Sequence, residues 1–190
     1  MQNNQNSFYV IKSNVINIKS ELLYREAEDD FFYFNKINSA LRKLNTAIKL
    51  TPSHLKSLKL LADIYFMKGN FKKALNLYLS AQGIKDDFKS LAGIANCCFA
   101  MGKYDNAVNY VDMIIESVRT QNIALYSQLL EIKINSLVKL KQYKRAYDTY
   151  VKSKIFADEN SLKSIYDNYE LIREKISLQK RLNEVKLKIV

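Results

Sequence analysis

Few side chains in this sequence of 190 residues could carry out chemistry. There is one histidine, His54, and there are two cysteines, Cys97 and Cys98, which are adjacent. A single histidine leaves little for a zinc site or a histidine-dependent triad. Neighbouring residues of a helix point about 100° apart, so a disulfide between the two cysteines would have poor geometry. We expect two reduced, buried thiols, and neither a metal nor another cofactor.

Acidic residues gather in one place, where Glu26, Glu28, Asp29 and Asp30 follow closely on one another. Paired carboxylates can act as a general acid and base, but a charge run on a helix is more commonly a solvated face. The sequence contains no nucleophile motif and no glycine-rich phosphate loop. We therefore predict that the protein is not an enzyme.

The composition predicts that helices position these residues. Four glycines and one proline are too few for the corners of a β-sandwich or barrel, while 48% hydrophobic residues suffice for a core. The N-terminus lacks the charged and apolar regions of a signal peptide, and the longest nearly uncharged apolar stretch, 91–101, is too short to span a membrane. We expect an all-α protein in the cytoplasm, without a membrane span.

The formal net charge of +11 is spread evenly along the chain. A nucleic-acid surface is usually a concentrated stripe of basic residues, and only the stretch 139–154 has that character. A helical repeat protein associated with nucleic acid is thus an alternative that we keep open, although we favour a protein partner. Its basic residues would be Lys139, Lys141, Lys144, Arg145, Lys152 and Lys154.

The sequence contains an internal repeat. Ala40, Ala74 and Ala107 recur at spacings of 34 and 33 residues, and Ala146 follows after 39. Each alanine has an apolar residue three positions before it and a large residue four positions after it. The preceding residues are Ile37, Phe71, Tyr104 and Tyr143, and the following ones are Leu44, Tyr78, Val111 and Tyr150. A fixed period of this length is typical of stacked helix pairs.

The repeat resembles the tetratricopeptide repeat, a helix–turn–helix unit of 34 residues. The best copy, 55–87, supplies the residues typical of it: Leu58, Leu61, Ala62, Tyr65, Gly69, Phe71, Ala74, Tyr78 and Ala81. The resemblance implies a right-handed superhelix of about four helical hairpins over 21–160, with repeats at about 21–54, 55–87, 88–120 and 127–160. Gly69 and Gly102 are expected to end the first helices of their pairs in a left-handed conformation.

The two ends lie outside the repeats. Residues 1–20 are expected to be partly disordered or a short helix, and 161–190 to form one long helix that covers the last repeat. The second half of that helix has an apolar edge on a displaced register. It could contact a partner or a second copy of the chain through Leu178, Leu182, Val185 and Ile189.

The resemblance also implies a function, since the first helices of tetratricopeptide repeats line a concave groove. We expect a protein-interaction module, an adaptor, scaffold or chaperone-like holder, whose groove binds a hydrophobic and partly acidic segment of another protein. Phe66 and Phe99 should be partly exposed there, while Tyr65 and Cys98 are buried. The predicted groove residues are Arg25, Phe32, Lys56, Lys59, Asp63, Phe66, Lys89, Asn96, Phe99 and Asn135, together with Leu22, Asp29, Ala92, Gln128, Glu131 and Val138 at equivalent positions.

A narrower resemblance concerns the stretch 93–107. Its sequence, GIANCCFAMGKYDNA, is similar to the middle repeat of bacterial class II type III secretion chaperones, which hold hydrophobic translocators before export. The size and the apolar groove agree with that family. The positive charge and the fourth repeat do not, because the family typically has three repeats and is acidic. A secretion chaperone is therefore a second alternative.

Overall fold

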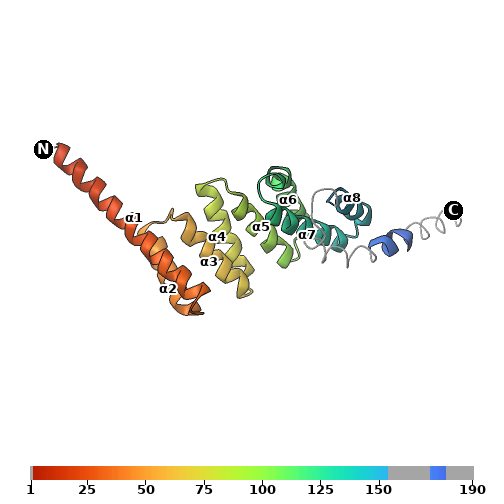
Figure 1. Cartoon of the computed structure of the whole chain (residues 1–190), viewed down its shortest axis with the longest axis horizontal. Helices are drawn as coiled ribbons and strands as arrows, with labels where there is room; N and C mark the ends of the chain where they lie inside the picture. The colour runs from red at the N-terminus through yellow and green to blue at the C-terminus, as the bar shows by residue number, and fades with distance from the viewer. Residues whose placement is uncertain (1, 154–171, 179–190) are drawn as a thin grey trace. The chain divides into compact units, whose positions relative to one another are not determined.

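The computed structural model describes residues 2–153 and 172–178, and all regular structure in these residues is helical. This confirms the predicted all-α class. Figure 1 shows the order of the helices, which are α1 (Gln2–Phe32), α2 (Ile37–Leu50), α3 (Leu55–Met67), α4 (Phe71–Ile84), α5 (Phe88–Ala100), α6 (Tyr104–Arg119), α7 (Ile123–Lys139) and α8 (Tyr143–Ser153). A further helical segment covers residues 172–178.

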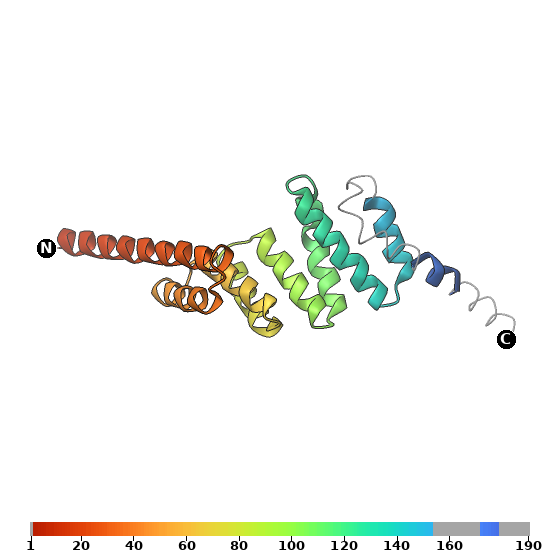
Figure 2. The same ribbon diagram turned by 60° about the horizontal axis from the view of Figure 1, so that its bottom comes forward.

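The helices form two compact units, residues 1–93 and 94–190. In the first unit α1 packs on α2, α2 on α3, and α3 on α4. In the second, α6 packs on α7 and α7 on α8. Figure 2 shows these neighbours running side by side in alternating directions, as in stacked helical hairpins.

Each hairpin turns through one residue in the left-handed conformation. The four residues are Asn35 (φ 51°), Gly69 (φ 74°), Gly102 (φ 75°) and Lys141 (φ 59°). At the second turn the Gly69 N–H donates to the Phe66 carbonyl and the Asn70 N–H to the Tyr65 carbonyl, both at 2.9 Å. This pair of bonds is the Schellman cap, and it confirms the roles predicted for both glycines.

Lys141 adopts a backbone conformation that favours glycine, and this gives a first testable expectation. Left-handed backbone costs a residue with a side chain about 1–2 kcal/mol, whereas glycine adopts it freely. We expect Lys141→Gly to raise the free energy of unfolding by about 0.5–1 kcal/mol after the larger entropy of unfolded glycine is counted. Lys139→Gly, two residues earlier and inside α7, is the matched control and should lower stability. A destabilised Lys141→Gly variant in chemical denaturation would contradict the turn geometry.

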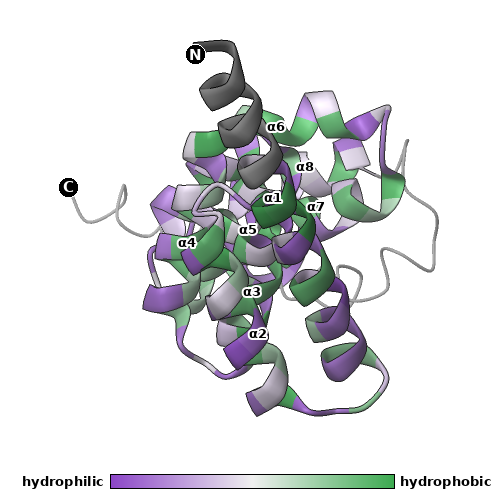
Figure 3. Cartoon of the chain, turned by 90° about the vertical axis from the view of Figure 1, so that its left-hand side faces the viewer, coloured by the Kyte–Doolittle hydropathy of each residue, from purple (hydrophilic) through white to green (hydrophobic). Residues whose placement is uncertain are grey.

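The core is built from the repeated small and large residues. Ala40, Ala74, Ala107 and Ala146 all have no exposed surface, as the repeat predicts. In the first unit Leu44, Leu60 and Ile64 complete a cluster around Ala40 and Ala27. Figure 3 shows hydrophobic and hydrophilic segments alternating along the helices. Such amphipathic helices bury one face and leave the other to solvent.

Helix α1 crosses the boundary that the sequence predicts at residue 20, because it runs without a break from Gln2 to Phe32. Its sequence contains no glycine or proline that would end it. Ser20 is buried, and its hydroxyl donates to the Ala47 carbonyl at 3.3 Å and lies 2.8 Å from the Thr51 hydroxyl. These bonds tie the middle of α1 to the end of α2, and Figure 1 shows the N-terminal half extending past α2.

The last described segment contains part of the C-terminal apolar stripe. Ile172 is buried, whereas Leu178 is 41% exposed. The other three residues of the predicted contact edge, Leu182, Val185 and Ile189, lie outside the described residues. The exposure of Leu178 leaves its contact with a partner or a second copy as a prediction.

Candidate functional site

A cleft of about 350 Å³ opens in the second unit between α5 and α7. Asn96 and Phe99 contribute from α5, one helical turn apart. Four residues contribute from α7, and because they stand at positions i, i+3, i+4 and i+7 they lie on one face of that helix. They are Gln128, Glu131, Ile132 and Asn135.

The cleft combines hydrogen-bonding groups with an apolar floor. Each amide of Asn96, Gln128 and Asn135 offers a donor and an acceptor, which matches the two polar groups of a peptide bond. Ile132 is buried and Phe99 is half-buried, its ring centroid 5.6 Å from that of Tyr104. This lining can hold the backbone of an extended polypeptide and cover one apolar side chain.

The structure therefore brings together five of the predicted groove residues of the third and fourth repeats, namely Asn96, Phe99, Gln128, Glu131 and Asn135. The prediction missed Ile132, because the repeat pattern assigns that position to packing between helices. The repeat frame also placed Val138 and Ala92 in the groove. Neither lines this cleft, and Val138 is half-buried while Ala92 is buried.

Two of the three groove lysines of the first unit are paired within the chain. The Lys56 ammonium lies 2.8 Å from Glu21 Oε1, and the Lys59 ammonium lies 3.1 Å from Asp87 Oδ2. The hydrogen bond from Lys56 lowers the pKa of Glu21, so this carboxylate stays charged. Both of these ammonium groups are thus paired with carboxylates of the chain itself.

Three further predicted residues of this unit have different surroundings. Arg25 is exposed and lies 3.3 Å from Glu21, and Lys89 is exposed. Asp63 accepts a hydrogen bond from the Tyr78 hydroxyl. Loss of solvation by the surrounding protein raises the pKa of Asp63, although the residue keeps access to solvent. The hydrogen bond from Tyr78 and the positive charge of Lys59 lower the pKa and so offset part of this effect. The hydrogen bond thus joins Asp63 of α3 to Tyr78 of α4.

The phenylalanines at equivalent positions differ in exposure. Phe66 and Phe99 are half-buried, as predicted, because aromatic residues five positions later cover them. Phe32 is 63% exposed. Cys98 is buried as expected, but Tyr65 is only half-buried, with the Lys73 ammonium 5.2 Å from its ring centroid. The expectation of a buried Tyr65 was wrong, because its ring packs against the core cluster of the first unit without being enclosed by it and remains partly exposed.

Other kinds of site were considered within the described part of the chain. Residues 2–153 and 172–178 contain no group of three His, Cys, Asp or Glu residues placed to hold a metal ion. In the same ranges, no helix combines the length and apolarity that crossing a membrane requires.

Comparison with known proteins agrees with this architecture. The family model described as anaphase-promoting complex, cyclosome, subunit 3 matches residues 30–114, which is less than half of the chain. Thirty-four chains of solved structures match. One is the crystal structure of a tetratricopeptide repeat protein from Parabacteroides merdae ATCC 43184, which is 16% identical, with a TM-score of 0.59 over 84% of this chain and 70% of that one. No curated protein matches the sequence.

The helical hairpins, their capped turns and the buried alanines define the fold. The chain has the fold of the tetratricopeptide repeat protein that it matches, as the repeated residues of the sequence predict.

Proposed function

We propose that the cleft between α5 and α7 binds an extended segment of a partner protein, and that the chain acts as a non-enzymatic adaptor or holder for that partner. The observation that supports this most directly is the clustering of three amide side chains around an apolar floor. Side-chain amides that pair with a peptide backbone give affinity without requiring one sequence, and the apolar floor selects a side chain.

The lining also favours a particular character for the bound segment. Glu131 is the charged residue among the six that line the cleft. A carboxylate beside an apolar surface suits a segment with one large apolar residue and a neighbouring Lys or Arg. An acidic segment would be repelled there, and the paired Lys56 and Lys59 of the first unit offer it little compensation. We therefore propose a neutral or basic segment in place of the partly acidic one that the sequence suggests.

Selection from a random peptide library tests this proposal. Peptides enriched on the full chain should contain an apolar residue next to Lys or Arg. We expect Asn96→Ala combined with Asn135→Ala to weaken their binding about tenfold or more, since each lost hydrogen bond costs about 0.5–1.5 kcal/mol. Glu131→Gln should weaken peptides that contain Lys or Arg more than matched peptides that lack a charge.

The matched control is Asn109→Ala, an exposed asparagine on α6 outside the cleft, which should leave binding unchanged. Circular dichroism of each variant shows that the helices persist. Unchanged binding in the double asparagine variant, or enrichment of acidic peptides only, would contradict the proposed site.

A further inference from the structure

The tip of the first hairpin exposes three consecutive aromatic residues. Phe32, Tyr33 and Phe34 are 63%, 79% and 61% exposed. They occupy the end of α1 and the start of the loop to α2, which forms the tip of this hairpin in Figure 1. The backbone holds them there, since the Tyr33 and Phe34 N–H groups both donate to the Asp29 carbonyl, at 3.0 and 3.2 Å.

The repeat itself does not require this exposure. At the equivalent position of the second hairpin, Phe66 packs on Phe71 with ring centroids 5.2 Å apart, and Phe99 packs on Tyr104 in the third. The residue five positions after Phe32 is the aliphatic Ile37, which leaves much of the ring uncovered. Tyr33 and Phe34 follow Phe32 directly. The pairs at the same positions of the other three hairpins are Met67–Lys68, Ala100–Met101 and Lys139–Leu140, so only the first of the four hairpins has an aromatic pair there.

Basic residues surround the same tip. A cavity of about 690 Å³ beside it is lined by Lys36, Arg42 and Lys68 together with polar residues and Ile37, and its lining contains no acidic residue. The Lys36 ammonium lies 5.1 Å from the centroid of the Phe34 ring. Asp30, the acidic residue nearest in sequence to the loop, forms an ion pair with Lys43 at 2.8 Å. The lining of the cavity is therefore basic, while the exposed Asp29 of α1 lies one turn before Tyr33.

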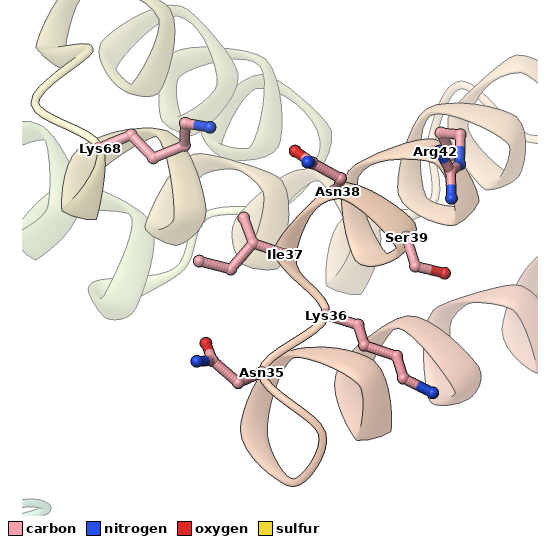
Figure 4. Close-up of a pocket in the computed structure, with 7 residues that line it drawn as sticks. All are labelled: Asn35, Lys36, Ile37, Asn38, Ser39, Arg42 and Lys68. Atoms are coloured by element: carbon pink, nitrogen blue, oxygen red, sulfur yellow. The ribbon is translucent and has the colours of Figure 1, made fainter.

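The cations do not converge on a single point. In Figure 4, Lys68 extends from the end of α3 toward Asn38, while Lys36 extends to the other side of the loop and Arg42 lies one turn further along α2. Such a distribution suits several anionic groups spread over a surface better than one bound ion. The N-terminus of α2, which begins at Ile37, adds positive potential between them.

We propose that this tip docks on the surface of an anionic phospholipid bilayer, with Phe32, Tyr33 and Phe34 entering the headgroup region and Lys36, Arg42 and Lys68 contacting lipid phosphates. Aromatic rings favour the boundary between headgroups and acyl chains, and basic side chains beside them are attracted to anionic lipid. A single-stranded nucleic acid is less well matched, because it stacks on flat ring faces and Phe32 meets Phe31 edge to face at 69°. The partner cleft lies in the other unit, so this inference stands apart from the proposed function.

Binding of the full chain to vesicles tests the proposal. The chain should sediment with vesicles of phosphatidylcholine and phosphatidylserine, and far less with phosphatidylcholine alone. Tyr33→Ser with Phe34→Ser should lower the partition coefficient at least about tenfold, because two exposed rings lose their apolar contact. Met113→Ser, which removes a 68% exposed side chain from α6, is the control and should bind as the unaltered chain does.

The charges are tested in the same way. Removing three cations with Lys36→Gln, Arg42→Gln and Lys68→Gln should lower the partition coefficient about 100-fold, since each basic residue at the surface contributes about fivefold. Removing three exposed lysines elsewhere with Lys85→Gln, Lys144→Gln and Lys152→Gln gives the same net charge. That control should change the partition coefficient by about threefold or less, because charges far from the membrane surface interact with it only through long-range electrostatics, which salt screens.

Insertion itself can be observed directly, because the chain contains no tryptophan. The indole introduced by Phe34→Trp should shift its emission to shorter wavelength on vesicles with phosphatidylserine and be quenched by brominated acyl chains, whereas that of Met113→Trp should not. An unshifted Phe34→Trp emission on sedimented vesicles would overturn the proposal. So would equal losses in the two triple variants, or tip-dependent binding to single-stranded RNA without binding to vesicles.

Discussion

Gly93→Leu should destabilise the protein by about 3 kcal/mol, because there is no room for a side chain at this position. A Cβ atom placed on Gly93 would lie 2.5 Å from Cε1 and Cζ of the Tyr78 ring. Tyr78 is buried, and its hydroxyl donates to Asp63, so the ring cannot move aside without losing that bond. The midpoint of chemical denaturation measures the loss.

The sequence suggests which second change should relieve the clash. Tyr78 stands four residues after the repeat alanine of α4, and Leu44 holds the same place in α2. Gly93 and Leu60 are likewise equivalent, each the sixth residue of its repeat, and Leu44 and Leu60 belong to one buried cluster. The pair Tyr78 and Gly93 thus stands where the preceding repeat has Leu44 and Leu60. One large and one small residue take the place of two leucines, so the total side-chain volume is similar.

Tyr78→Leu combined with Gly93→Leu should accordingly be more stable than the sum of the two single changes predicts, by at least about 1 kcal/mol. Gly83→Leu is the matched control, since Gly83 is helical and has no atom within 4 Å of its Cβ position. It should be neutral or stabilise by about 0.5 kcal/mol through helix propensity. Equal losses at Gly83 and Gly93 would mean that propensity and not the Tyr78 contact decides the effect.

Much of this architecture is predictable from the sequence, because the same type of residue recurs at equivalent positions of several repeats. The four alanines are all fully buried, and the turns at Gly69 and Gly102 have the expected left-handed backbone. Lys133 departs from the repeat, where leucine is usual, yet α7 still forms. Its ammonium lies 2.6 Å from Asp112 of α6, so an ion pair takes the place of an apolar contact.

The candidate site was less accessible to sequence reasoning, because it depends on contacts between distant residues. The repeat frame identifies Asn96, Phe99 and Asn135 as groove positions, but it does not show which of them enclose a cleft. Lys56 and Lys59 were expected to meet an acidic partner. Their actual partners are Glu21 and Asp87, 35 and 28 residues away, and no local pattern indicates such pairs. The exposed tip depends similarly on one aliphatic residue, Ile37, where other hairpins have an aromatic one.

Ala74→Leu should destabilise the protein by about 1–3 kcal/mol, and this result depends on the repeat frame itself. Ala74 has no exposed surface and lies in α4, which packs directly on α3. Packed helices lie about 8–10 Å apart, and small residues at the contact allow the shorter distances. Three added carbon atoms must therefore force the two helices apart or adopt a strained rotamer.

The effect can be separated from helix propensity, because alanine and leucine are both good helix formers. Ala124→Leu places the same side chain at an exposed position of α7 and should leave the melting temperature nearly unchanged. Ala74→Ser, which adds a single atom, should be less harmful than Ala74→Leu. If Ala74→Leu melts at the temperature of the unaltered chain, the alanine does not lie at a close helix contact, and the alignment of the four repeats on Ala40, Ala74, Ala107 and Ala146 is wrong.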